Sequence, residues 1–502
     1  MGAGVGQRSP RGLPNTMRVT SMRSRLAVAV TLLLLMTPAA ALAQDARAAL
    51  QAAAKALGAT DLKSYEMTAS GENWATGQSP APGSPWPRFV IKSLTRSVNY
   101  ETASVRDVWV RTQGEDPPRG GGVQPVRGEQ RQVFVVSGDH AWNVVNDAAI
   151  PAPIALAARQ LELWATPHGV IRAAQASNAA VQGRLIVFAA PGRYHARATL
   201  DRANLVARVH ALIPNPVLGD IPIVFEYADY KDFGGVKFPT RIKQTAGGFP
   251  TLDLTVTEVR ANVPVDVTVP DNVRSATAPY ATVTPQMVAD GVWYLTGGTH
   301  HSVVIEMSDH LVVVEAPLND ERALAVLKEA RGLAPNKTVR YVINSHHHFD
   351  HAGGLRAFAA EGVTVITHEI NRPYFDRAFA ARATIEPDQL TKSGRKAAAV
   401  EGVRDKRVLT DGTRSIEIHH IAGNTHDDGL LMVYLPKERL LSQADTFTPP
   451  PANTPPPMPP SPFTLNLVDN LARLGLTVDR LLPLHGRIVP LADLYQAAGR
   501  AN

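Results

Sequence analysis

The sequence predicts an α+β protein in which a mainly antiparallel β domain is followed by a domain where strands and helices alternate. Up to about residue 275, short runs of alternating apolar and polar residues are separated by Gly and Pro, which is typical of antiparallel strands. From Ala276 onward, apolar runs alternate with helical patterns, which predicts two mixed sheets covered by helices. The 502 residues suffice for at least two domains. We expect these domains at 44–275 and 276–502.

The first 43 residues have the features of a secretory signal peptide. Five arginines precede an apolar run from Leu26 to Met36, and Ala41-Leu42-Ala43 forms a small-x-small end. We therefore expect cleavage after Ala43 and a periplasmic or secreted protein. The apolar run is too short to span a bilayer and no later stretch is longer, so we expect no stable membrane span after cleavage.

The charge balance does not favour a nucleic-acid partner. The whole chain has 51 Lys and Arg against 45 Asp and Glu, a formal net charge of +6. Removing the five arginines of the expected signal peptide leaves 46 basic against 45 acidic residues. A nearly neutral protein lacks the basic surface that binds polyanions, so we expect a small-molecule substrate and no nucleic acid.

The first domain is expected to be a curved or flat β-sheet with few helices. An Ala-rich helix over Asp45–Leu57 ends at Gly58, and a second helical pattern runs from Ile154 to Ala173. Strands are predicted at ten alternating runs: Tyr65–Ala69, Phe89–Leu94, Val108–Thr112, Gln132–Val136, Ala141–Val145, Leu185–Phe188, His195–Leu200, Val206–Leu212, Val224–Tyr227 and Leu252–Val259. The segment Phe225–Gln244 resembles the terminal strands of the curved-sheet lipoprotein-carrier-like family of the bacterial envelope. The alternative is a general β scaffold that packs beside the second domain.

The second domain is expected to alternate strands with helices. Strands are predicted at Gly291–Thr296, Ser302–Met307, Leu311–Val314, Val339–Ile343, Val363–Thr367, Ser415–His419, Leu430–Leu435 and Arg439–Leu441. Helices are predicted at Asn319–Gly332, Gly353–Glu361, Asn371–Ala383, Phe463–Leu474 and Leu491–Ala498. The proline-dense segment Pro449–Pro462 must be an extended loop, either a surface connection or a substrate lid.

Histidines are concentrated in this second domain. Of the 16 histidines, twelve fall between His300 and His485. The densest group, Asn344–Gly354, follows a predicted strand and reads NSHHHFDHAGG. It offers His346, His348, Asp350 and His351 from one loop, while His426, Asp445 and His485 follow later strands or precede an apolar run. Because the chain has no cysteine, imidazole and carboxylate are the ligands available to a zinc-like cation.

The H-x-H-x-D-H motif and the later His, Asp and His resemble the metallo-β-lactamase superfamily, an αββα sandwich of zinc-dependent hydrolases. The resemblance covers about Ala289 to the C-terminus. It implies two Zn²⁺ ions held by seven residues: His346, His348 and His426 at the first site, Asp350, His351 and His485 at the second, and Asp445 as the bridging carboxylate. It also implies that hydroxide formed at the two ions attacks the substrate, with Asp350 orienting it and accepting its proton.

Several neighbours of these residues are candidates for supporting roles. Glu315 stands where the family usually has an aspartate, and the resemblance implies that it orients the ligand loop. Asp427 follows His426 and either supports the site or solvates a turn. His347, between two expected ligands, should point away from them. His300 and His301, after Gly297-Gly298, could line the pocket or cap the loop; we include His301 among the supporting candidates.

The leading function is a secreted binuclear zinc hydrolase of an ester, lactone, thioester, amide or related bond. Asp445 argues against the lactamase branch that uses a cysteine at this position. Hydrolysis of β-lactams is therefore the first alternative and not the leading function. A mononuclear-iron enzyme of the persulfide dioxygenase type is a second alternative, because it shares the His346, His348, His426 and Asp445 positions. A non-catalytic envelope ligand carrier is the third, and the intact ligand set argues against it.

Overall fold

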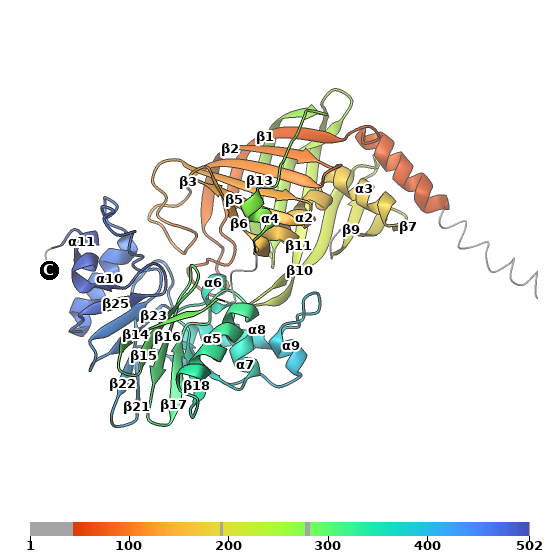
Figure 1. Ribbon diagram of the computed structural model, residues 1–502. Helices are drawn as coiled ribbons and strands as arrows, with labels where there is room; N and C mark the ends of the chain where they lie inside the picture. The colour runs from red at the N-terminus through yellow and green to blue at the C-terminus, as the bar shows by residue number, and fades with distance from the viewer. Residues whose placement is uncertain (1–43, 191–193, 277–281, 501–502) are drawn as a thin grey trace, which may run out of the picture.

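The computed structural model describes residues 44–190, 194–276 and 282–500, and the expected signal peptide 1–43 lies outside them. Two domains follow one another along the chain. The N-terminal one is a large curved sheet, and the C-terminal one is a compact layered body beneath it (Figure 1). Within the described residues no helix is both long and apolar enough to cross a bilayer.

The N-terminal sheet consists of two antiparallel meanders joined side by side. The described residues form thirteen strands in the order β6-β5-β4-β3-β2-β1-β13-β12-β11-β10-β9-β8-β7. Strands that follow one another in the chain pair, except β6 and β7, which lie at the two edges, and the pairing of β1 with β13 joins the two meanders. The strands are β1 (Ser64–Trp74), β2 (Arg88–Asn99), β3 (Ser104–Gln113), β4 (Gln130–Ser137), β5 (His140–Val145), β6 (Ala148–Pro151), β7 (Ala180–Gln182), β8 (Leu185–Ala189), β9 (His195–Leu200), β10 (Val206–Asn215), β11 (Gly219–Asp232), β12 (Lys237–Ala246) and β13 (Phe249–Ala261).

Helices cover one face of this sheet and bury its apolar side chains. A helix over residues 44–57 precedes β1, and η1 (Pro153–Ala155), α2 (Leu156–Ala165) and α3 (Pro167–Ala176) separate the two meanders. The residues from Ile154 to Ala173, for which the sequence predicts a helical pattern, are helical but are divided between these three elements. They are divided because Pro167 begins a new helix and the Thr166 side chain caps it by accepting from Gly169 N at 3.1 Å.

The C-terminal domain contains two sheets. The first has the order β14-β15-β16-β17-β18-β19-β20 and the second the order β21-β22-β23-β24-β25-β26. Their strands are β14 (Thr284–Ala289), β15 (Val292–Thr296), β16 (Ser302–Glu306), β17 (His310–Val314), β18 (Thr338–Ile343), β19 (Thr364–His368), β20 (Val400–Val403), β21 (Lys406–Thr410), β22 (Ser415–His420), β23 (Leu431–Leu435), β24 (Leu440–Gln443), β25 (Arg480–Pro483) and β26 (Val489–Pro490). The helices, with α4 in the linker, are α4 (Asp271–Arg274), α5 (Asp320–Leu333), α6 (Phe349–Ala352), α7 (Leu355–Ala360), η3 (Glu369–Asn371), α8 (Arg372–Ala380), α9 (Gln389–Ser393), α10 (Pro462–Leu474) and α11 (Leu491–Ala497).

Burial explains the four-layer order of this domain. Val312 and Val314 of β17 face the second sheet, whereas Leu311 and Val313 face the helices α5 and α7. A strand buried on both faces reads as a continuous apolar run, which is what the sequence shows here. On the outer face of the second sheet, α10 and α11 cover a separate apolar cluster. The expected α+β class with an αββα sandwich is confirmed.

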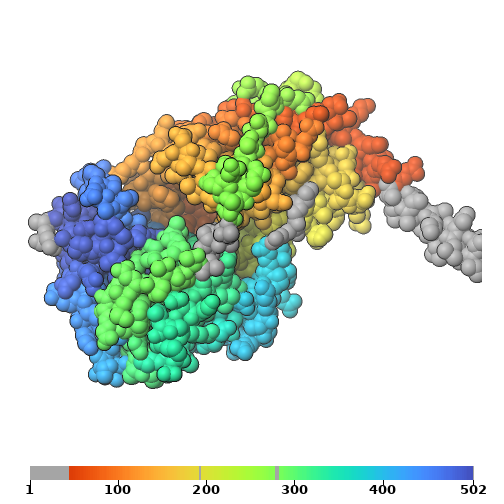
Figure 2. Space-filling model, in the orientation of Figure 1, coloured from red at the N-terminus to blue at the C-terminus, as the bar shows by residue number. Residues whose placement is uncertain are grey.

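The two domains touch along an apolar seam next to α6. The Trp86 ring packs edge-on against the Phe349 ring, with 6.5 Å between centroids. Ile221 and Ala246 belong to the same buried cluster, and Val217 of the β10–β11 turn is buried against the helical layer of the C-terminal domain. In Figure 2 the N-terminal domain (red through yellow to light green) rests on the C-terminal one (green to blue). This seam lies directly beside the histidine-rich loop.

Candidate metal centre

Six connections of the C-terminal domain bring histidines and acids to one place. They are β15–β16 with His300, β17–α5 with Glu315, β18–α6 with His346 and His348 (continued in α6 by Asp350 and His351), β22–β23 with His426, β24–α10 with Asp445, and β25–β26 with His485. Most of these side chains are almost completely buried. Two groups of four potential ligand atoms result, each with all its atoms within 4.8 Å of one another.

The first group consists of His346, His348, His426 and Asp445. His346 Nε2 lies 2.9 Å from His348 Nδ1 and 3.3 Å from His426 Nε2. Asp445 Oδ2 lies 3.4 Å from His346 Nε2 and 3.0 Å from His426 Nε2. Three imidazole nitrogens and one carboxylate oxygen therefore surround a single point, which is a ligand set for a tetrahedral cation.

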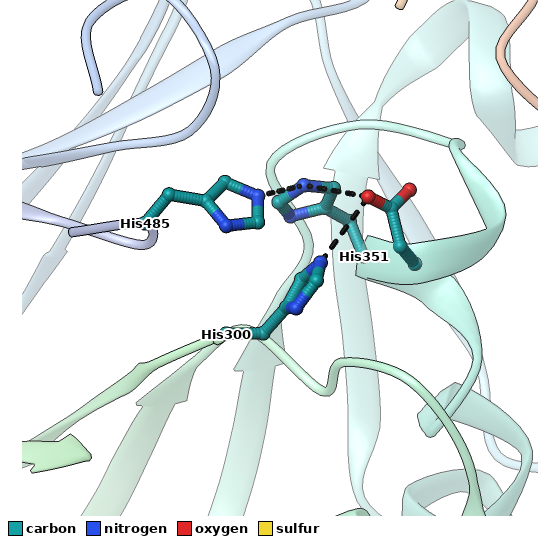
Figure 3. A group of neighbouring side chains, drawn as sticks. His300, His351 and His485 are labelled. Atoms are coloured by element: carbon teal, nitrogen blue, oxygen red, sulfur yellow. Dashed lines mark hydrogen bonds and ion pairs between the residues drawn. The ribbon is translucent and has the colours of Figure 1, made fainter. Parts of the chain in front are cut away.

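The second group consists of His300, Asp350, His351 and His485. Figure 3 shows its three imidazoles converging on one position. His351 Nε2 lies 3.0 Å from His485 Nε2, and Asp350 Oδ2 lies 3.7 Å from His351 Nε2 and 3.2 Å from His300 Nε2. His300 thus adds a third imidazole to a group for which the sequence indicated two.

Asp445 lies between the two groups. Its Oδ2 faces His426 and His346, and is also 3.1 Å from His351 Nε2, while its Oδ1 is 3.0 Å from His485 Nε2. Its backbone has a φ of +61°, a conformation that costs a non-glycine residue about 1–3 kcal/mol. A strained backbone that aims both carboxylate oxygens at different imidazoles is the arrangement a bridging ligand needs.

The outer nitrogen of several rings is fixed by an acceptor. The carbonyl oxygen of Ser79 lies 2.8 Å from His348 Nε2, and that of Thr299 lies 3.0 Å from His485 Nδ1. A carbonyl oxygen can only accept, so these ring nitrogens carry the protons. The inward nitrogens, His348 Nδ1 and His485 Nε2, therefore present lone pairs to the centre, which is the tautomer that a metal ligand requires.

Glu315 holds the loop that carries the first histidines. Its buried carboxylate accepts hydrogen bonds from Asn344 Nδ2 at 3.0 Å and from the Ser345 hydroxyl, and lies 3.2 Å from His351 Nδ1. Ser345 Oγ lies 2.8 Å from His346 Nδ1, so the same hydroxyl can accept from His346 while donating to Glu315. One carboxylate thus orients a ring of each group.

The electrostatics of the centre favour bound positive charge. Burial alone would raise the pKa of Asp445, but the adjacent His351 and His485 hold it well below its usual value. Burial together with the neighbouring His346 lowers the pKa of His348. Against burial, Asp445 and Asp350 raise the pKa of His351 well above its usual value. The carboxylates are therefore ionised and attract a cation, or a proton on His351 in its place.

The residues fit a pair of N/O-ligated divalent cations. Imidazole nitrogens 2.9–3.3 Å apart cannot all be satisfied by donating to one another when their outer nitrogens already carry the protons. A cation among them satisfies every lone pair at once, and imidazole with carboxylate suits zinc or iron.

The supporting candidates lie outside the two four-residue groups. His301 Nε2 is 2.9 Å from Gly486 O and its backbone N donates to Leu484 O at 2.9 Å, so it holds the turn that carries His485. Asp427 is buried with its Oδ2 2.5 Å from His347 Nδ1. His347 therefore points away from the centre, toward Asp427.

Sequence reasoning did not include His300 in the ligand set. The only signal was a pair of histidines after Gly297-Gly298, with no spacing that related them to the motif loop. The backbone between β15 and β16 decides which of the pair turns inward, and the structure places His300 against Asp350 while His301 faces Gly486.

A cavity of about 450 Å³ reaches the centre at Asp445. Its walls come from both domains: Val126 and Arg127 on the N-terminal side, and Phe447 and Phe463 on the C-terminal side. The proline-dense segment borders it through Pro450 and Pro457. The Arg127 guanidinium donates to the carbonyl of Pro459 in the same segment, so a residue that lines the cavity makes a hydrogen bond across the domain boundary.

Known proteins resemble parts of this chain. The model of the metallo-beta-lactamase superfamily matches residues 295–485. The 2,4-dinitroanisole O-demethylase subunit alpha of Nocardioides sp. (strain JS1661) is 28% identical over 204 residues, 40% of this chain and 57% of that protein. The probable metallo-hydrolase YqjP of Bacillus subtilis (strain 168) is 33% identical over 96 residues, 19% of this chain and 27% of that protein. The chain thus spans little more than half of the first relative and about a quarter of the second.

Solved structures with a similar fold include two metallo-β-lactamases. The enzyme from Pontibacter korlensis has a TM-score of 0.34 and 16% identity, covering 43% of this chain and 98% of that one. FIM-1 from Pseudomonas aeruginosa, in its mono-zinc form, has a TM-score of 0.35 and 15% identity, covering 45% of this chain and 96% of that one.

Proposed function

The C-terminal domain belongs to the metallo-β-lactamase superfamily, and from that membership we propose that the chain is a binuclear zinc-dependent hydrolase. The substrate would be a small molecule with an ester, lactone, thioester, amide or related bond. The observation that carries the proposal is the position of Asp445, whose carboxylate contacts imidazoles of both groups. Such an arrangement supports two cations that share one ligand.

The residues divide into two ligand sets with one shared member. His346, His348 and His426 would hold the first ion; Asp350, His351 and His485 the second, with His300 as a further donor; and Asp445 both. When bound, a pair of zinc ions brings the pKa of a water molecule toward ~7 and polarises the bond to be cleaved.

Asp350 is the carboxylate best placed to handle the proton. Its Oδ1 accepts from Gln78 Nε2 at 2.8 Å, and its Oδ2 is 3.2 Å from His300 Nε2. Despite burial, His351 and His300 hold the pKa of Asp350 well below its usual value, so it is ionised and can accept a hydrogen bond from the attacking water. Asp350 would thus orient that water and receive its proton.

The cavity at Asp445 supports a small-molecule substrate. Phe447 and Phe463 give it apolar wall next to Asp445, as is usual for sites that bind small molecules. We further propose that residues 1–43 are removed on export and that the enzyme acts in the periplasm or outside the cell.

The test is metal content combined with a substrate screen on the chain that begins at Gln44. We expect about two zinc ions per chain and hydrolysis of at least one ester, lactone, thioester, amide, phosphodiester or sulfate. The screen includes β-lactams and also 2,4-dinitroanisole, the compound in the name of the Nocardioides relative. One iron per chain with oxygen consumption on a persulfide would replace the proposal by the dioxygenase alternative. Copurified lipid without any hydrolysis would favour a carrier.

A further inference from the structure

Two loops of the N-terminal domain are docked on the loops that carry the metal ligands. In the β1–β2 connection, the Gly77 carbonyl accepts a hydrogen bond from Phe349 N at 3.2 Å. The Pro80 carbonyl of the same connection accepts one from Asp428 N at 2.7 Å. In the β3–β4 connection, Gly120 N donates to Thr425 O at 2.8 Å. Main-chain hydrogen bonds therefore bind both ligand loops, 346–351 and 425–428, to the other domain.

Gln78 connects these loops to a ligand of the second group. Its Nε2 donates to Asp350 Oδ1 at 2.8 Å, while its Oε1 accepts from Gly122 N at 3.0 Å. Because both ends of the amide are engaged, its orientation is fixed, and with it the rotation of the Asp350 carboxylate. The other oxygen of Asp350 is thereby left facing His300 and His351.

Ser79 performs the corresponding role for the first group. Its carbonyl accepts from His348 Nε2 at 2.8 Å and so keeps the lone pair of that ring on Nδ1, facing the centre. Its hydroxyl lies 3.0 Å from His347 Nε2. The residue is buried, so no water competes for these contacts.

The β3–β4 connection packs so closely on Gln78 that there is no space for a side chain at Gly121. A Cβ there would lie 2.0 Å from Gln78 Oε1 and 3.1 Å from His348 Cε1. The conformation at Gly121 is itself open to other residues, since its φ is not positive. An alanine at this position would therefore act by displacing the Gln78 amide.

We infer that the metal centre is built by both domains, with Gln78 and the Ser79 carbonyl of the N-terminal domain as positioning groups for Asp350 and His348. The inference rests on the proposed function only in that the two groups bind metal. It gives the N-terminal domain a part in the chemistry beyond that of a scaffold. It also explains why the cavity at Asp445 has walls from both domains.

The test uses Gln78→Ala and Gly121→Ala in the full chain, titrated with Zn²⁺ against a chromophoric chelator and with Co²⁺ by absorption. Both variants should weaken binding of the ion at the Asp350 group by about 10- to 100-fold, the usual effect of losing an outer hydrogen bond to a ligand. The Co²⁺ spectrum of that ion should change, and in Gln78→Ala the affinity of the first ion should stay within about twofold. The matched controls are Gln182→Ala on the exposed strand β7 and Gly332→Ala in α5, where a Cβ meets open space.

The possible results distinguish a role of Gln78 in orienting Asp350 from a role in holding the two domains together, and both from the proposed hydrolase activity. Equal affinities for both ions in Gln78→Ala and Gln182→Ala would overturn the inference. So would a parallel loss of both ions with a lowered unfolding temperature, since that would show that Gln78 only holds the domains together. A wild-type chain that binds two ions, loses one selectively in Gln78→Ala, and hydrolyses nothing would contradict the proposed function and leave the inference intact.

Discussion

In the N-terminal domain the buried carboxylate of Asp107 faces an arginine, whereas in the C-terminal domain the largely buried carboxylate of Asp445 faces imidazoles. Arg96 donates to both oxygens of Asp107, at 2.8 and 2.6 Å, and Glu162 lies 3.3 Å from the same guanidinium. Around Asp445 the imidazole nitrogens are 3.0–3.4 Å away and compete for the same space. The first network is complete within the protein, whereas the second presents imidazole lone pairs and a carboxylate that a bound cation would satisfy.

The single buried histidine of the N-terminal core extends this contrast. His168 is fully buried, stacks on Phe238 with 5.8 Å between ring centroids, and has Nε2 3.4 Å from Leu57 O. Burial lowers its pKa to about 4, so it remains neutral and acts as a packing group. His168 therefore has a structural role, whereas the buried histidines around Asp445 face one another and a carboxylate, as metal ligands do.

The largest expected effect is that of Asp445→Ala. Because both groups share this carboxylate, the variant should lose at least one metal equivalent, and turnover should fall to background. Elemental analysis and the most active substrate of the screen measure the two effects. Unchanged metal content and rate would contradict the bridging role.

The matched change in the other domain is Asp107→Asn. It leaves the buried Arg96 guanidinium with only the Glu162 carboxylate at 3.3 Å, which should destabilise the N-terminal domain by up to about 3–5 kcal/mol. Metal content at neutral pH and 25 °C should stay at the wild-type value. Two results would contradict the distinction between the Asp107 network and the Asp445 centre. One is loss of metal in Asp107→Asn; the other is a free energy of unfolding that Asp445→Ala lowers, in the metal-free protein, as much as Asp107→Asn does.

A smaller effect is expected for Glu315→Gln. The amide keeps the size of the side chain, but its single oxygen can replace only one of the two carboxylate oxygens. If that oxygen accepts from Asn344, the NH2 group faces Ser345 and His351 Nδ1 and cannot accept from either. Outer partners of this kind usually change metal affinity by about 10- to 100-fold. Competition with a chelator at pH 7 measures the change. An affinity equal to that of wild type would mean that the backbone alone orients the ring.

The sequence predicted seven of the eight residues in the two groups, because these residues lie in one histidine-rich loop and at the ends of strands. His346, His348, Asp350 and His351 share a single turn after β18, and His426, Asp445 and His485 each follow or precede an apolar strand. The structure brings all seven together in two groups. Such local patterns can be recognised in the sequence, because they bring their side chains together whenever the strand ends meet at one edge of the sandwich.

The rest depended on contacts that no local pattern encodes. Gln78 and Asp350 are 272 positions apart, and neither the composition nor the spacing around Gln78 distinguishes it from other loop glutamines. Most of the strands that the sequence did not predict are short or lie at edges, but β12 is a ten-residue strand between β11 and β13. β14 is mostly exposed and contains Pro285, and β20 has only four residues, one of them Gly402. A strand without a fully buried face leaves no clear alternation in the sequence.

The smallest expected effect concerns pH and His168. Its pKa is lowered from 6.5 to about 4 on folding, so between these values the unfolded chain binds more protons and stability falls as the pH falls. Between pH 7 and pH 5 this residue should cost the fold about 2 kcal/mol, a cost that His168→Gln should remove. Five of the six tryptophans precede residue 262, so tryptophan fluorescence in denaturant titrations follows the N-terminal domain. Chelator in every sample keeps the metal centre from contributing. A wild-type protein whose stability changes with pH no more than that of His168→Gln would mean that this histidine is already protonated when folded, and that the contrast between packing and ligand histidines does not hold.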